Sequence, residues 1–188
     1  MRFPLFDLDT LQSPGAAPSW SPGGSKLYVM AKPAPELARV VHRLDECADH
    51  RPPALLHSPI QLVGDRSWLT DADIAAACRH LSRVRYAPFL MLFDRIEGGE
   101  RMMLSGGNRN CAAQDFRLAI LDALFGHFER LPAYDATPHM TIDDHGRGRP
   151  GRLLDQPIAW LVEEFMLVES VQGDTRHVEW GRWRLRDD

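Results

Sequence analysis

The sequence lacks the features that are typical of membrane proteins, of secreted proteins, and of small proteins stabilised by a bound metal. No stretch of its 188 residues approaches the roughly 20 consecutive apolar residues that a membrane-spanning helix needs. The first residues, MRFPLFDLDTLQSPG, lack the apolar core of a secretion signal. Only Cys47, Cys78 and Cys111 are present, without a C-x-x-C pair, which favours buried, reduced thiols over disulfides or a zinc site. We therefore expect a cytoplasmic protein that makes no membrane contact.

A surplus of positive charge is also missing. The chain carries 22 basic and 26 acidic residues, a formal net charge of −4 with histidine neutral. This balance excludes a protein that coats nucleic acid through bulk charge, because such binding depends on many lysine and arginine contacts to phosphates. The length predicts one domain, which at this size needs no disulfide or metal for stability.

Alternating apolar residues predict a series of strands. Turn-forming residues dominate positions 1–24, which we expect to form an irregular N-terminal arm. A glycine-containing turn at 97–100 predicts a β-hairpin, whose strands must be antiparallel. The expected strands are Lys26–Met30, Leu55–Val63, Phe89–Phe93, Arg101–Leu104, His139–Ile142, Ile158–Val168 and Val178–Leu185.

Helical periodicity appears between these strands. One apolar stripe runs from Leu37 to Cys47, with prolines just before it. Thr70 and Asp73 resemble a capping box at the start of a second helix. The longest helix is expected over 113–130, ended by Pro132. Helices interleaved with antiparallel strands predict an α+β fold.

Two histidines lie in matched strand-like segments. In an extended chain, residues i and i+2 point to the same face, so His139 and Thr141 share a face, as do His57, Pro59 and Gln61. The second segment therefore pairs a proton-transfer group with a hydroxyl donor. Imidazole, with an unperturbed pKa near ~6.5, can either accept or donate a proton at neutral pH.

These segments resemble the two H-x-T/S-hydrophobic motifs of the two-histidine (2H) phosphoesterases, the LigT-like family of bacterial 2′-5′ RNA ligases and cyclic phosphodiesterases. The 82-residue spacing suits that family, as do Gly64-Asp65 after the first motif and Pro138 before the second histidine. Three C-terminal segments add to the resemblance, which covers roughly residues 25 to 185: 157–160, 164–170 and 178–183.

The resemblance implies a single two-lobed domain over 25–188, with antiparallel sheets flanking a central cleft and helices outside. It implies metal-independent hydrolysis of 2′,3′-cyclic phosphate RNA ends or small cyclic nucleotides, and reversible 2′-5′ RNA ligation. His57 and His139 would be catalytic, with His139 as base and His57 as acid in hydrolysis; ligation would exchange the roles, and the sequence does not fix their order. We expect no cofactor or metal, an RNA 3′ end or cyclic nucleotide as substrate, and a monomer.

The first motif departs from the family pattern, because Pro59 stands where the family has Thr or Ser. The hydroxyl of Ser58 is adjacent, yet strand alternation points it to the opposite face unless a bulge turns it back. Gln61 is another donor on the face of His57. Thr141, Gln61 and Ser58 are accordingly the expected phosphate-binding residues.

Other interpretations compete with this one. Pro59 motivates a catalytically weakened RNA- or nucleotide-binding protein of the same fold as the alternative function. His139, Asp143 and His145 have the residue types of a metal site, but no defined geometry. The remaining histidines are expected to be inert: His42, His50, His80, His127 and His177.

Overall fold

A computed structural model describes residues 24–44, 51–128, 131–134, 137–171 and 176–187. The expected N-terminal arm and Cys47 lie outside these ranges, apart from Gly24. The strands are β1 (Ser25–Ala31), β2 (Ser58–Asp65), β3 (Phe89–Glu97), β4 (Met102–Ser105), β5 (His139–Asp143), β6 (Arg152–Val162), β7 (Glu164–Val171) and β8 (Arg176–Arg184). The helices are α1 (Pro35–His42), α2 (Asp71–Leu81) and α3 (Cys111–Leu124), with short 3₁₀ turns at Pro53–Leu55, Arg66–Trp68 and Gly107–Arg109.

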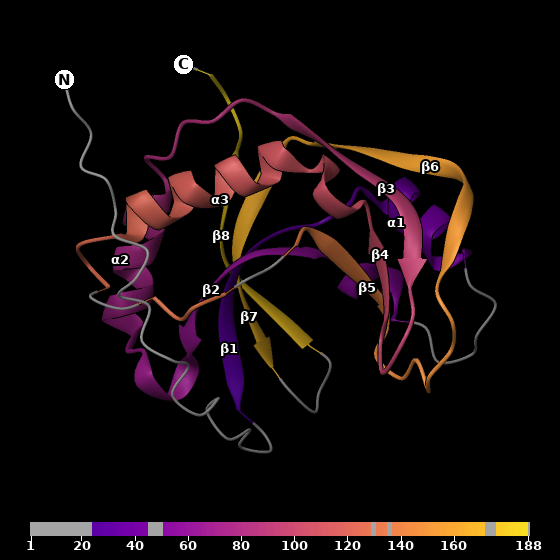
Figure 1. Cartoon of the computed structure of the whole chain (residues 1–188). Helices are drawn as coiled ribbons and strands as arrows, with labels where there is room; N and C mark the ends of the chain where they lie inside the picture. The colour runs from indigo at the N-terminus through magenta and orange to yellow at the C-terminus, as the bar shows by residue number, and fades with distance from the viewer. Residues whose placement is uncertain (1–23, 45–50, 129–130, 135–136, 172–175, 188) are drawn as a thin grey trace, which may run out of the picture.

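The strands form two four-stranded sheets (Figure 1). The first sheet has the order β2-β1-β7-β8 and the second has the order β5-β4-β3-β6. Every strand pair is antiparallel, including the predicted hairpin of β3 and β4. The α+β class predicted from the hairpins and helical stripes is therefore confirmed. Within the described ranges, no helix is both long enough and apolar enough to span a bilayer.

The capping pattern that begins the second helix is also confirmed. Thr70 Oγ1 accepts a hydrogen bond from the Asp73 backbone N–H, and the Asp73 carboxylate accepts one from the Thr70 backbone N–H. This reciprocal pair satisfies two amide donors that a helix start otherwise leaves open. It also lowers the pKa of Asp73, because its carboxylate accepts hydrogen bonds from the Thr70 side chain and backbone.

Several predicted boundaries are wrong. Helix α1 ends at His42, so the apolar stripe predicted from Leu37 to Cys47 is helical only in its first part. Helix α3 ends at Leu124 rather than near residue 130, because Phe125 is extended and Gly126 takes a left-handed φ of 99°. The single strand expected over 158–168 is two strands, β6 and β7, which belong to different sheets. Between them, the Glu163 carbonyl accepts a hydrogen bond from the Leu185 backbone N–H. Glu163-Glu164 interrupt the apolar run at this point, but the interruption alone does not reveal that the chain changes its hydrogen-bonding partner.

One continuous apolar core joins the two sheets. Phe116 of α3 is fully buried and contacts aromatic rings from both sheets. Its ring centroid lies 5.3 Å from that of Phe89 in β3 and 5.2 Å from that of Phe165 in β7. Such aromatic contacts add to the hydrophobic gain of burying large side chains. Helix α3 therefore packs one side chain between the sheets and helps to set their separation.

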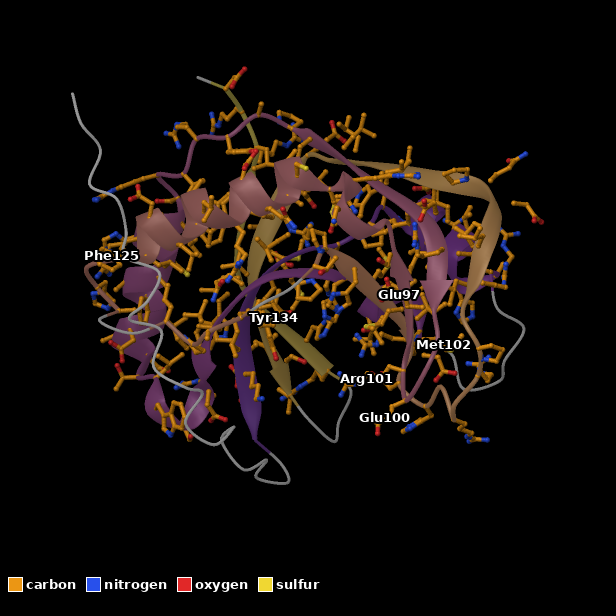
Figure 2. The ribbon with its side chains drawn as sticks, in the orientation of Figure 1. Glu97, Glu100, Arg101, Met102, Phe125 and Tyr134 are labelled. Atoms are coloured by element: carbon orange, nitrogen blue, oxygen red, sulfur yellow. The ribbon has the colours of Figure 1, made fainter. Side chains whose placement is uncertain are left out.

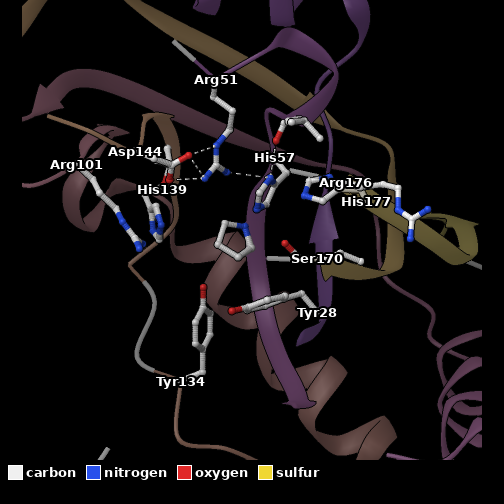
Figure 3. A pocket seen from close by; sticks show the side chains of 14 residues that line it. Tyr28, Arg51, His57, Arg101, Tyr134, His139, Asp144, Ser170, Arg176 and His177 are labelled. Carbon is white, nitrogen blue, oxygen red and sulfur yellow. Dashed lines mark hydrogen bonds and ion pairs between the residues drawn. The ribbon is translucent and has the colours of Figure 1, made fainter. Parts of the chain in front are cut away.

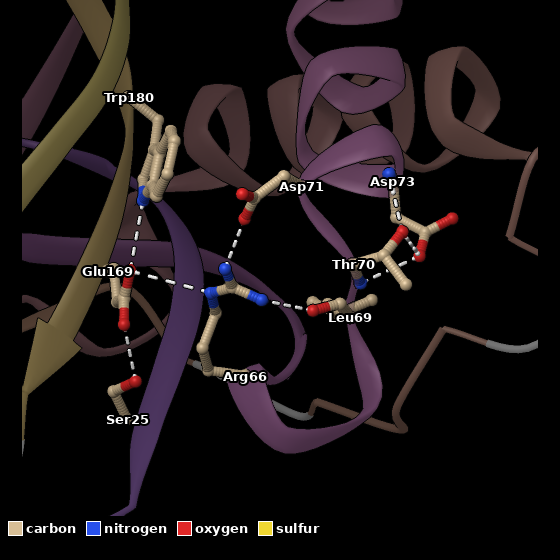
Figure 4. Close-up of polar contacts among 8 residues, drawn as sticks. All are labelled: Ser25, Arg66, Leu69, Thr70, Asp71, Asp73, Glu169 and Trp180. Atoms are coloured by element: carbon tan, nitrogen blue, oxygen red, sulfur yellow. Dashed lines mark hydrogen bonds and ion pairs between the residues drawn. The ribbon is translucent and has the colours of Figure 1, made fainter.

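A polar cluster ties the chain before α2 to the first sheet (Figure 4). Arg66 contacts Asp71 at the start of α2 and lies 3.8 Å from the Glu169 carboxylate of β7. Glu169 also accepts hydrogen bonds from Trp180 Nε1 at 3.1 Å and from Ser25 Oγ at 2.5 Å. This cluster fixes the start of α2 against the first sheet.

The described cysteines partly contradict the sequence expectation. Cys78 and Cys111 are free thiols, as predicted, but Cys111 is exposed at the start of α3 rather than buried. Cys78 is only partly buried, and the number and spacing of the cysteines, on which the prediction rested, do not determine their exposure.

Candidate active site

A pocket of about 330 Å³ lies between the two sheets and receives side chains from both (Figure 3). His57 immediately precedes β2, and His139 is the first residue of β5. β2 and β5 are edge strands of their respective sheets and contact one another. The two histidines predicted from separate segments therefore line one pocket, although 82 positions separate them in sequence.

The backbone holds both imidazoles in the same way. His57 Nδ1 lies 2.7 Å from the Leu55 carbonyl oxygen, and His139 Nδ1 lies 2.8 Å from the Thr137 carbonyl oxygen. A carbonyl oxygen only accepts, so each Nδ1 carries the proton and donates it. This choice of tautomer leaves each Nε2 with a free lone pair. Each histidine is thus fixed by the carbonyl two residues before it, with Nε2 available for proton transfer.

Arg51 connects the two histidine-bearing segments. Its Nη2 lies 2.6 Å from Asp144 Oδ1, and its Nε lies 3.1 Å from Asp144 Oδ2. Arg51 Nη1 also lies 3.5 Å from His57 Nδ1. Because that nitrogen already donates its proton to Leu55, the contact with the guanidinium acts through charge rather than as a hydrogen bond.

The surroundings of His57 favour its neutral form. Its pKa is lowered to about 3, with burial as the largest cause and the positive charge of Arg51 as the next. His177 and Lys32 contribute in the same direction, while the hydrogen bond to the Leu55 carbonyl acts in the opposite direction. In the unliganded protein at neutral pH, His57 is therefore an uncharged imidazole.

Of the three expected phosphate-binding residues, only Thr141 lines the pocket. It stands two positions after His139 in β5, as the strand alternation predicts. The residue is 7% exposed and shares the cavity with both histidines. Thr141 is consequently placed to donate a hydrogen bond to a ligand between them.

Gln61 and Ser58 do not line the pocket. Gln61 is fully buried, and its amide donates to the backbone carbonyls of Leu62 and Pro132 while its oxygen accepts from Arg117 Nε at 2.9 Å. The reason is a bulge in β2, where Met30 pairs with Pro59 but Val29 pairs with Gln61. The extra residue breaks the alternation that would align Gln61 with His57.

Ser58 is fully buried, and its hydroxyl has no hydrogen-bond partner among the described residues. Strand alternation correctly excluded it from the face of His57, and the bulge follows it rather than turning it back. Pro59 does line the pocket. On the His57 side of the pocket, the position equivalent to Thr141 is therefore occupied by a proline ring, which has no hydrogen-bond donor.

Several pocket residues were not predicted from the sequence. His177, expected to be inert, lines the pocket, and its ring centroid lies 4.9 Å from that of His57. Arg101 of the β3–β4 hairpin and Tyr134, from the segment after α3, both labelled in Figure 2, also line it (Figure 3). No local pattern identifies these residues, because strand register and loop packing bring them together. The HVEW sequence around His177 does show strand-like alternation, which was the available signal.

The lining of the pocket is suited to an anion. Arg51, Arg101 and Arg176 contribute positive charge, and the one carboxylate among the described lining residues, Asp144, is paired with Arg51. Tyr28 and Tyr134 form an edge-to-face pair 6.2 Å apart, and burial is the main cause that raises the pKa of each phenol. Both phenols are therefore protonated donors at neutral pH.

The metal site considered from sequence is not assembled by the fold. Asp143 is fully buried, where its carboxylate contacts Arg149 and accepts a hydrogen bond from the His145 backbone N–H at 2.7 Å. Among the residues that the structure describes, no three His, Cys, Asp or Glu side chains gather in a ligand arrangement.

Comparison with known proteins identifies the architecture. No family model and no curated protein sequence matches the chain. Among solved structures, E. coli LigT complexed with 3′-AMP superposes with a TM-score of 0.69 at 17% identity, covering 86% of this chain and 98% of that chain. A protein described as a phosphoesterase gives a TM-score of 0.67 at 16% identity over 86% and 99% of the two chains. TT0787 of Thermus thermophilus gives 0.62 at 20% identity over 87% and 99%. The chain therefore has the LigT-like fold.

Proposed function

We propose that this protein is a metal-independent phosphodiesterase that hydrolyses 2′,3′-cyclic phosphates at RNA ends or in small cyclic nucleotides. The observation that carries the proposal is the matched pair of imidazoles, each anchored through Nδ1 to a backbone carbonyl and each lining one cationic pocket. Such a pair supplies both partners for proton transfer on opposite sides of a phosphate.

Hydrolysis of the cyclic phosphate requires attack by water on phosphorus and cleavage of one ribose O–P bond. One imidazole takes a proton from the water, and the other gives a proton to the departing ribose oxygen. Thr141 donates to a non-bridging oxygen, and the arginines balance the charge of the phosphate. Residues of the chain itself position the substrate and donate the hydrogen bonds that the transition state needs.

His139 is the proposed base and His57 the proposed acid, in line with the resemblance. The neutral state of His57 in the unliganded protein adds a requirement to this assignment. A negatively charged phosphate beside the ring favours the imidazolium, so His57 acquires its proton when the substrate binds. In the reverse direction, 2′-5′ ligation of RNA ends, the two roles exchange.

The size and charge of the pocket favour the end of an RNA or a single nucleotide over a long duplex. The cavity of about 330 Å³ is at the lower end of the range for small-molecule sites. The net charge of −4 disfavours extended backbone contacts outside it. LigT, which shares the fold, has been solved with 3′-AMP, ATP and NADP+, and this supports a nucleotide ligand.

The second candidate function is binding of RNA ends or nucleotides with weakened catalysis. The specific observation behind it is Pro59, which lines the pocket without offering a hydroxyl. Both functions use the same pocket, so turnover and binding must be measured separately.

The test is hydrolysis of a 2′,3′-cyclic nucleotide in the presence of EDTA. We expect turnover by the wild-type protein, and losses on the order of 100-fold or more in both His57→Ala and His139→Ala. His80→Ala is the matched control, because His80 lies on α2 beside His127 and away from the pocket. Nucleotide binding without turnover would favour the binding protein. Activity that EDTA abolishes and a metal restores would overturn the proposed mechanism.

A further inference from the structure

The two halves of the pocket differ at one equivalent position. Thr141 follows His139 by two residues, and Pro59 follows His57 by two residues; all four side chains line the pocket. Thr141 offers a hydroxyl, whereas proline has neither a side-chain donor nor a backbone N–H. A phosphate held between the histidines therefore finds a donor from the second sheet but none at the matching position of the first sheet.

His177 lies on the side where the donor is missing. It belongs to β8 and pairs with Ser170 of β7, another pocket residue. Its ring meets that of His57 edge to face, at 4.9 Å between centroids and 78° between planes (Figure 3). His177, on the edge strand opposite β2 in the first sheet, thus lies next to His57.

The state of its two ring nitrogens indicates how His177 is used. Nδ1 is buried and has no hydrogen-bond partner among the described residues. A buried N–H without an acceptor is more costly than an unused lone pair, so the proton of the neutral ring belongs on Nε2. Nδ1 of His177 is therefore not available to a ligand, and Nε2–H is the hydrogen-bond donor that His177 can offer.

The charges around His177 suit this role. Burial is the main cause that lowers its pKa to about 4, and Lys32 and Arg51 contribute through their positive charge. The ring is therefore neutral at pH 7 and keeps one N–H donor. The same two cations attract an anion to this side of the pocket.

We propose that His177 replaces the missing hydroxyl of the first motif, with its Nε2–H donating to a non-bridging oxygen of the bound phosphate. The inference rests on the proposed function, since it concerns how the same pocket holds its phosphate. It assigns to β8 a ligand-binding residue that neither histidine motif contains. It also explains how a proline at position 59 is compatible with a working phosphate site.

The experiment uses three variants of the full chain. His177→Phe keeps a ring against His57 but removes the donor, Pro59→Thr adds a hydroxyl at the position that lacks one, and the third variant combines both changes. Each is tested for binding of adenosine 3′-monophosphate by calorimetry and for hydrolysis of adenosine 2′,3′-cyclic phosphate, after circular dichroism has shown a folded protein.

We expect His177→Phe to weaken nucleotide binding and to lower kcat/KM by about 10- to 100-fold, the usual effect of losing a hydrogen bond to a charged group. Addition of Pro59→Thr should recover most of that loss in the double variant, and should have a smaller effect in the wild-type background. This non-additivity is the signature of one donor replacing another. A purely structural role for His177 would not be relieved by a hydroxyl at position 59.

Two results would overturn the inference: unchanged nucleotide affinity in His177→Phe, or a loss that Pro59→Thr leaves uncorrected. The binding measurement keeps this result separate from the proposed function. If no form of the protein hydrolyses the cyclic substrate but His177→Phe still binds the nucleotide at least about tenfold more weakly, the inference holds and the proposed reaction fails. If hydrolysis is normal in His177→Phe, the reaction stands and the inference fails.

Discussion

Arg51 and Asp144 form a two-point ion pair across the pocket, with nitrogen–oxygen distances of 2.6 and 3.1 Å. Arg51 stands before β2, and Asp144 directly follows β5. The Arg51 backbone N–H also donates to the Ile142 carbonyl at 2.9 Å. Side chain and backbone together therefore hold the segment that leads to His57 against the strand that begins with His139.

The charge of Arg51 should be measurable at His57. Arg51→Met removes the cation 3.5 Å from Nδ1, so the pKa of His57 should rise from about 3 towards its ordinary value. The rise is partial, since burial is the larger cause and persists in the variant. NMR titration of the His57 ring proton checks this. Arg39→Met, on the exposed face of α1, is the control and should leave the titration unchanged. An unchanged or lower pKa in Arg51→Met would contradict the electrostatic interpretation.

Binding of the phosphate should be accompanied by proton uptake at His57. The ring is neutral in the free protein, and the proposed acid must be protonated in the complex. Calorimetry with adenosine 3′-monophosphate near ~pH 5.5, well above the pKa of the free ring, measures the protons taken up when buffers of different ionisation enthalpy are compared. We expect a net uptake that is smaller in His57→Gln. Equal uptake in the two proteins would show that His57 stays neutral, and would exchange the roles of His57 and His139.

Acid should destabilise the fold through the same histidine. In the folded chain His57 has a pKa of about 3, whereas an exposed histidine in the unfolded chain titrates near ~6.5. Between these values the unfolded state binds more protons, so the free energy of unfolding falls as the pH falls. The contribution is intact above about pH 6.5 and declines by at most about 1.4 kcal/mol for each pH unit below it. Urea unfolding at about pH 7.5, 6 and 5 should give a shallower decline in His57→Gln; parallel declines would refute the shifted pKa.

Gln61 should matter for stability rather than for catalysis. Gln61→Leu removes the acceptor of Arg117 and the donor to the Pro132 carbonyl, both in a buried setting. We expect a loss of about 1–3 kcal/mol in the free energy of unfolding, because buried polar groups are left without partners. Denaturant unfolding measures this loss. The kcat/KM for a cyclic nucleotide should change less than about threefold, and a loss as large as that of His139→Ala would return Gln61 to the phosphate site.

Thr141 should show the opposite pattern. Thr141→Val keeps the shape of the side chain in β5 but removes the hydroxyl from the pocket. We expect kcat/KM to fall by about 10- to 100-fold, with little change in thermal stability. Thr141→Ser restores the donor and should recover most of the activity. Equal activity in the Val and Ser variants would exclude a hydrogen bond from this residue to the substrate.

Much of the fold was predictable because its signals are local. The Thr70–Asp73 capping box and the 97–100 hairpin turn each lie within a few residues, and both are confirmed. The end of α3 and the division between β6 and β7 were not predicted correctly. The first depends on the φ of Gly126, and the second depends on a change of sheet at Glu163, where two glutamates interrupt the apolar pattern without specifying the new partner strand.

The residues of the candidate site fall into the same two groups, those with a local sequence signal and those without one. His57, His139 and Thr141 were predicted from two short segments and from the resemblance of those segments to paired histidine motifs, and all three line the pocket. Gln61 was misplaced because a single extra residue in β2 reverses the alternation beyond it. His177 was missed because its position depends on the pairing of β8 with β7, which no segment of the sequence specifies alone.

The position of Phe116 bears on how the geometry of the pocket can change. Within the described residues no strand ladder joins the two sheets, so the span between the imidazoles depends on side-chain volume in the shared interior as well as on the contacts of Arg51 with Ile142 and Asp144. The ring of Phe116 packs between those of Phe89 and Phe165, so it helps to set the spacing of the two sheets although it does not line the pocket. Proton transfer is sensitive to sub-ångström misplacement. Repacking around α3 is therefore a route by which substitutions remote from the pocket adjust its geometry while the fold persists.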